Sequence, residues 1–238
     1  MDRSSVLRVL RGEFTWRTLR AFLAVVLAAI AVLLGIAWAL YEASNPGKPY
    51  NILADQISTL GNTKQNPRGF YLFSAALWVL SFAAVPLLRF YRRALPPLQA
   101  RVTGVFVFFF AIGIPGTALV GFFPSSFDST VHLVVAALAL GGIGLAFFLS
   151  GFGIITSKIR DRNEKIPIAL AIPFAVFICF VIFGATVVGY TAAAGIFNDV
   201  DGTWLSFSLW EWLLLGAILA MCAVTGLQLA RMAATTRG

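Results

Sequence analysis

His132, the only histidine of the chain, lies near the start of an apolar segment, four residues after Asp128. That spacing places both side chains on one face of a helix, where they can interact. A histidine oriented by a carboxylate can act as an acid, a base or a hydrogen-bond donor to a lipid headgroup. Asp128 also precedes Ser129 and Thr130 as a helix N-cap would, so a purely structural role for the pair is the alternative.

Glu211 is the second residue that could do chemistry, because it lies about seven residues inside the last apolar segment. A carboxylate within a bilayer is costly, and it usually faces the interior of a helix bundle with a partner. We therefore expect Glu211 to lie near His132, as a proton acceptor or ligand-binding group. The alternatives are a structural ion pair and a headgroup-level residue between Trp210 and Trp212.

A loop between the first two apolar segments carries polar residues at regular positions. Its apolar residues recur near helical spacing, which predicts a short amphipathic helix from Ile52 to Leu60 with Ile52, Leu53, Ile57 and Leu60 facing inward. This loop either packs on the helix ends as a lid or covers a polar pocket. The candidate pocket residues are Asp55, Ser58, Arg68, Asp128, His132 and Glu211.

Known catalytic and metal-binding patterns are missing from the sequence. It contains no G-x-S-x-G or H-E-x-x-H motif, so no catalytic residue is assigned. One histidine cannot build a three-histidine zinc site. Cys179 and Cys222 both lie within apolar segments rather than in a metal-binding or disulfide pattern. We expect neither a metal nor a cofactor.

The composition of the chain indicates what class of protein holds these residues. The 238 residues are 59% hydrophobic and only 12% charged, with a mean hydropathy of +0.87. Soluble domains carry about 25% charged residues, so a soluble enzyme is excluded. Disorder is excluded as well, because the chain contains 22 Phe and 6 Trp. The sequence is that of a multi-pass membrane protein.

Six apolar stretches are long enough to cross a bilayer, which takes about 20 helical residues. We predict an all-α bundle of six transmembrane helices that forms one membrane domain over residues 1–238. The predicted spans are approximately 22–41, 70–90, 102–123, 130–155, 167–197 and 204–229. The fourth span is rich in glycine, which allows close helix approach and predicts a central position.

Basic residues are distributed very unevenly between the two sides of these spans. All but three of the 18 Lys and Arg residues precede the first span, follow the last, or lie between spans two and three or four and five. The exceptions are Lys48, Lys64 and Arg68. By the positive-inside rule both termini are cytoplasmic. The positive charge then faces anionic lipid headgroups of the cell membrane, and a nucleic-acid partner is excluded.

Short motifs in the middle of the chain support a family resemblance. The first outer loop contains Ile57-Ser58-Thr59-Leu60-Gly61, and the third span ends in Val120-Gly121-Phe122-Phe123-Pro124 before a span with one histidine. In this order the chain resembles a prokaryotic membrane-protein family, domain of unknown function 998. It is also similar to the six-span damage-regulated autophagy modulator family, although Thr59 replaces the acid that follows Ser there. The resemblance covers residues 58–148 and implies architecture rather than a reaction.

Three function classes fit these features. The first is a non-catalytic membrane protein with an outer-leaflet polar pocket, which binds membrane lipids or assembles with a membrane-protein partner or a second copy. The second is a membrane-embedded enzyme acting on a lipid or headgroup, because Asp, Glu, His and Ser converge on one leaflet. The third is a proton-coupled transporter, for which Glu211 is the only candidate carboxylate within a span.

The charge asymmetry predicts that Lys64 and Lys158 lie on opposite sides of the membrane. Lys64→Cys and Lys158→Cys would be made singly in a chain whose two native cysteines are replaced by Ala. A membrane-impermeant maleimide should label the first variant in intact cells and the second only after lysis. Labelling of both variants in intact cells would contradict the predicted orientation.

Overall fold

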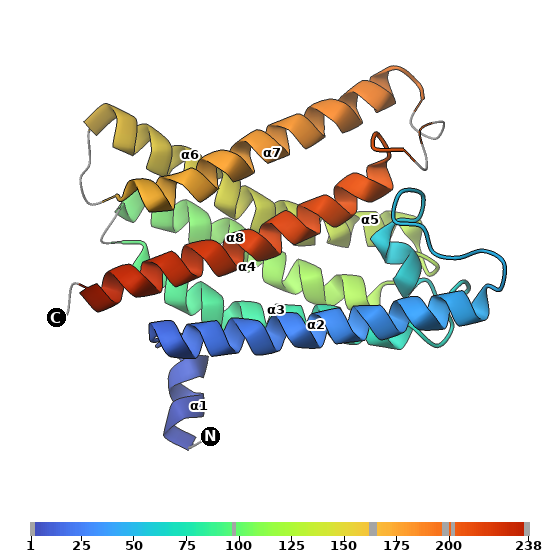
Figure 1. The fold of residues 1–238 in the computed structure, drawn as a ribbon, viewed down its shortest axis with the longest axis horizontal. Coiled ribbons are helices and arrows are strands. Elements are labelled where there is room, and N and C mark those ends of the chain that lie inside the picture. Colours follow the sequence, from blue (N-terminus) through green and yellow to red (C-terminus); the bar gives the residue numbers. More distant parts are fainter. Residues whose placement is uncertain (1–2, 97–98, 162–165, 197–199, 201–202, 236–238) are drawn as a thin grey trace.

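The protein folds into an all-helical bundle (Figure 1). The computed structural model describes residues 3–96, 99–161, 166–196, 200 and 203–235, and no strand occurs within these ranges. The helices are α1 (Arg3–Leu10), α2 (Trp16–Ser44), η1 (Ile57–Gly61), α3 (Phe70–Ala94), α4 (Ala100–Phe122), α5 (Ser129–Ala136), η2 (Ala137–Gly141), α6 (Gly142–Asp161), α7 (Ile168–Ala193) and α8 (Phe207–Thr235).

Within the described residues, six helical segments are long and apolar enough to cross a membrane, as predicted. The fourth of them, Ser129–Ile159, is made of α5, η2 and most of α6. The helices differ from the predicted spans mainly at their ends. The helix α2 starts at Trp16 because the Thr15 side chain accepts the Thr18 backbone N–H and caps it, ahead of the apolar stretch. The predicted end of the fifth span, Phe197, lies outside the described residues.

The six spanning segments form a closed ring. Each packs against its predecessor in sequence, and α8 closes the ring by contacting α2. The helix α8 also contacts α3 and α6, and it runs obliquely across the middle of the view in Figure 1. The helix α1 and the end of α8 lie at one end of the bundle, and η1 lies at the other, which we call the lid end.

A π-helical turn, η2, interrupts the fourth segment between α5 and α6. It packs directly on the backbone of α4. A Cβ atom built on Gly116 would lie 2.6 Å from the Ala139 nitrogen, and one built on Gly142 would lie 2.6 Å from the Gly113 nitrogen. The predicted close approach of the glycine-rich segment is therefore confirmed, and α6 packs against α4, α7 and α8.

Replacing Gly142 with Ala should destabilise the protein, because the new methyl group meets backbone atoms that cannot move aside. We expect the free energy of unfolding to fall by about 1–3 kcal/mol, the usual range for overpacking. The neighbouring Gly141 has no atom within 4 Å of a built Cβ, so Gly141→Ala is the matched control. It should leave stability unchanged or raise it by up to about 1 kcal/mol. Denaturant titration in detergent measures the free energy of unfolding of both variants. An equal loss of stability in the two would contradict the close packing of Gly142 on α4.

Candidate functional site

The loop of residues 45–69, which we call the lid, covers one end of the bundle and is tied down by Asn66. This side chain is fully buried. Its Nδ2 donates to the carbonyl oxygens of Ala37 in α2 and Leu60 in η1 at 3.0 and 2.9 Å, and its Oδ1 accepts the Gly69 N–H at 3.0 Å. One amide thus joins α2, the lid and the start of α3.

The predicted lid helix from Ile52 to Leu60 is wrong in its first half. Only Ile57–Gly61 is helical, as a 3₁₀ turn, and Ile52 is 37% exposed rather than turned inward. The cause is local, since the Asp55 carboxylate accepts the Asn51 N–H at 2.9 Å and the Asn51 side chain accepts the Leu53 N–H at 3.0 Å. Such side-chain bonds to backbone amides compete with helix formation.

The start of α8 holds the lid through three hydrogen bonds. The Glu211 carboxylate accepts the Ile57 N–H at 3.0 Å, and the Ser208 hydroxyl donates to the Ala54 carbonyl oxygen at 3.0 Å. The Trp212 indole donates to the Tyr50 hydroxyl at 3.0 Å. These contacts bridge residues more than 150 positions apart in the chain, and they fix the lid over the ends of the spans.

Tyr50 is the aromatic centre of this junction. Its ring lies 4.8 Å from that of Trp38 and 5.4 Å from that of Tyr41, measured between centroids, and Trp212 approaches edge-on at 6.3 Å. Its hydroxyl donates to the Gln56 carbonyl oxygen at 2.9 Å. Burial raises the pKa of Tyr50 above its usual range, so the phenol stays neutral and keeps its proton for this bond.

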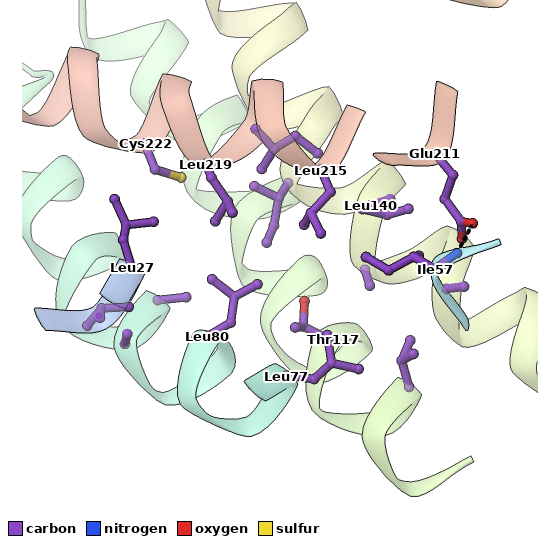
Figure 2. A pocket seen from close by; sticks show the side chains of 18 of the residues that line it. Leu27, Ile57, Leu77, Leu80, Thr117, Leu140, Glu211, Leu215, Leu219 and Cys222 are labelled. Carbon is purple, nitrogen blue, oxygen red and sulfur yellow. Dashed lines mark hydrogen bonds between the residues drawn. The ribbon is translucent and has the colours of Figure 1, made fainter. Parts of the chain in front are cut away.

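A cavity of about 90 Å³ lies beneath the lid, inside the ring of helices. Figure 2 shows Ile57 and Glu211 at its lid end and Leu27 and Cys222 toward the other end. Ser58, next to Ile57, and His132, whose ring is hydrogen-bonded to the Phe123 carbonyl oxygen at the end of α4, also line the cavity. From Glu211 to Cys222 the cavity follows eleven residues of α8, roughly 16 Å at 1.5 Å per residue. The walls between are almost entirely apolar and include Leu77, Leu80, Leu140, Leu215 and Leu219.

The hydrogen bond of His132 determines which of its ring nitrogens carries a proton. Its Nδ1 lies 2.7 Å from the Phe123 carbonyl oxygen, which can only accept, so Nδ1 carries the hydrogen. In the neutral ring Nε2 is then an acceptor, and it has no hydrogen-bond partner among the described residues. The expected partner Asp128 instead caps α5 by accepting the N–H groups of Thr130 and Val131 at 2.8 and 2.9 Å.

The structure brings three of the six predicted pocket residues to one cavity, namely Ser58, His132 and Glu211. Asp55 is engaged in the lid turn described above, and Asp128 is the exposed N-cap of α5. Arg68 is exposed and does not line the cavity. His132 and Glu211 share the cavity without a hydrogen bond between them in the described part of the chain.

Sequence reasoning missed the depth of the cavity and one polar residue on its wall, Thr117. Its hydroxyl donates to the Gly113 carbonyl oxygen at 2.8 Å, a common use of threonine inside an apolar helix. Nothing in the sequence singles out Thr117, because threonine is an ordinary residue within a membrane-spanning helix. Within the described ranges no three His, Cys, Asp or Glu side chains are close enough together to hold a metal ion.

A second cavity of about 230 Å³ lies between α7 and α8. Its walls come mainly from these two helices and include Phe180, Gly184 and Trp210. Leu140 and Glu211 line both cavities. Glu211 therefore lies between the two cavities.

Fold and site together define a class: a six-span helical membrane protein with a lid-covered, largely apolar cavity that is polar at one end. The chain belongs to the family described as "Protein of unknown function (DUF998)", which matches residues 26–228. This confirms the family predicted from the motifs and extends the match beyond residues 58–148. No curated protein and no solved structure matches the chain.

The Glu211 bond to the lid predicts a local effect of substitution. Glu211→Leu removes the acceptor and leaves the buried Ile57 N–H unpaired, which costs about 1–3 kcal/mol. We expect the Ile57 amide to exchange with deuterated water at least about tenfold faster. Glu211→Gln keeps a carbonyl oxygen and should change the rate less than about threefold. Equal exchange in the wild type and Glu211→Leu would show that Glu211 does not hold the lid.

Proposed function

We propose that the protein binds a lipid, with one hydrocarbon chain in the cavity beneath the lid and the polar group against Ser58, His132 and Glu211. The observation that carries this proposal is the lining of one cavity, which is almost entirely apolar along α8 and includes the side chains of Ser58, His132 and Glu211 beneath the lid. A chain-like cavity with this polarity matches an amphiphile better than it matches an ion or a water-soluble substrate. By the charge asymmetry, the polar end faces the outer leaflet of the cell membrane.

The volume limits what can enter. An engineered cavity of about 150 Å³ in a soluble protein holds one benzene molecule. At about 90 Å³, the cavity beneath the lid accommodates part of a single hydrocarbon chain and excludes a two-chain lipid as a whole. A second chain would have to remain outside the ring of helices, among the surrounding lipids.

The polar end must provide most of the selectivity. Transfer of a hydrocarbon chain from water into a protein gains about 0.8 kcal/mol per CH₂ group. Inside a bilayer this gain disappears, because lipid tails are as apolar as leucine. The hydrocarbon chain of the lipid therefore has only to fit the shape of the cavity. The polar groups at the lid end determine which lipid is bound.

Filling the cavity tests the proposal. Leu219 lines the cavity, whereas Leu213 on the same helix is 41% exposed. Leu219→Trp should remove most of the lipid that copurifies with the wild-type protein, counted as bound adducts by native mass spectrometry. Leu213→Trp is the matched control and should retain it. Equal adduct counts in both variants and the wild type would refute lipid binding in this cavity.

A further inference from the structure

We infer that the headgroup held at the lid end donates hydrogen bonds and bears no negative charge, as in a long-chain amine or alcohol. This inference rests on the proposed lipid binding and concerns the chemistry of the same cavity. Its basis is the kind of polar atom that the cavity offers to a ligand, which follows from the hydrogen bonds already made by Glu211 and His132.

Glu211 offers an acceptor. Its Oε2 accepts the Ile57 N–H, and its Oε1 has no hydrogen-bond partner among the described residues (Figure 2). An ionised carboxylate has only acceptor sites, and a positively charged headgroup beside it favours that ionised form. Because a lone charge within the membrane is costly, a ligand that brings a donor or a positive charge to Oε1 removes part of that cost.

His132 offers a second acceptor. Because Nδ1 donates its hydrogen to the Phe123 carbonyl oxygen, the neutral ring presents a lone pair at Nε2. The histidine lines the same cavity as Glu211. When the imidazole is neutral, a headgroup placed between them meets two acceptors, together with the Ser58 hydroxyl, which can donate or accept.

Cations that would attract an anionic headgroup are placed elsewhere. No Lys or Arg belongs to the described lining of either cavity. Lys64 and Arg68, the two cations that follow the lid helix in sequence, are both exposed. A phosphate or carboxylate at the lid end would therefore be buried without a compensating cation, and the burial of an unpaired charge disfavours binding.

A panel of amphiphiles with one chain length separates headgroup chemistry from chain binding. The probes are dodecylamine, 1-dodecanol and dodecanoate, added to the purified full chain in detergent micelles. Binding to the folded state raises the unfolding temperature, and the concentration dependence gives an apparent Kd. We expect dodecylamine and dodecanol to bind at least tenfold more tightly than dodecanoate.

Two variants test whether Glu211 causes the preference for one headgroup over another. Glu211→Gln should raise the apparent Kd of dodecylamine about tenfold and change that of dodecanol less than about threefold. The difference in affinity between dodecylamine and dodecanoate should therefore become smaller. Glu42→Gln is the matched control, because Glu42 is an exposed carboxylate near the end of α2 that lines neither cavity and accepts the Trp38 indole N–H at 2.7 Å. It should leave all three affinities unchanged.

The outcomes distinguish this inference from the proposed function. If all three probes bind the wild type equally and Leu219→Trp abolishes all three shifts, the headgroup inference is wrong and lipid binding stands. Preferential binding of dodecanoate would overturn the inference outright. If no probe shifts the wild type more than Leu219→Trp, both the inference and the proposed function fail.

Discussion

A carboxylate on a membrane-spanning helix needs a partner, and most of the site follows from how Glu211 meets that need. The sequence offers few cations on its side of the membrane, and the structure uses a backbone amide instead, the Ile57 N–H. Because that amide belongs to η1, the hydrogen bond of the Glu211 side chain attaches the lid to α8. The bond between Glu211 and Ile57 is thus one of the contacts that hold the lid over the cavity.

The lid is held at enough points to have one arrangement. Tyr50 and Trp212 pack edge to face and share a hydrogen bond, while Asn66 connects the lid with α2 and α3. Polar groups engaged in this way cannot rotate freely to suit a ligand. The acceptors at the cavity end are therefore arranged before anything binds, which reduces the conformational entropy lost on binding.

Much of the fold was predictable because its signals are local. Span length, the glycine-rich fourth segment and the Asp128 cap each depend on residues close together in sequence, and each is found as expected. The partners of Glu211 and His132 were not predictable, because both are backbone groups whose positions depend on tertiary packing. The first half of the lid helix failed because periodicity ignored the competing side-chain bonds of Asn51 and Asp55.

The π-turn η2 has a consequence for comparisons within the family. A π-turn holds one residue more than a regular helical turn, and each residue of a helix advances the direction of its side chain by about 100°. The angular position of His132 relative to Gly142 thus depends on the number of residues between them. A relative with one residue fewer in this stretch, folded as continuous helix, would turn the equivalent histidine away from the ring interior. Such a deletion would distinguish relatives that keep the polar end of the cavity from those that have lost it.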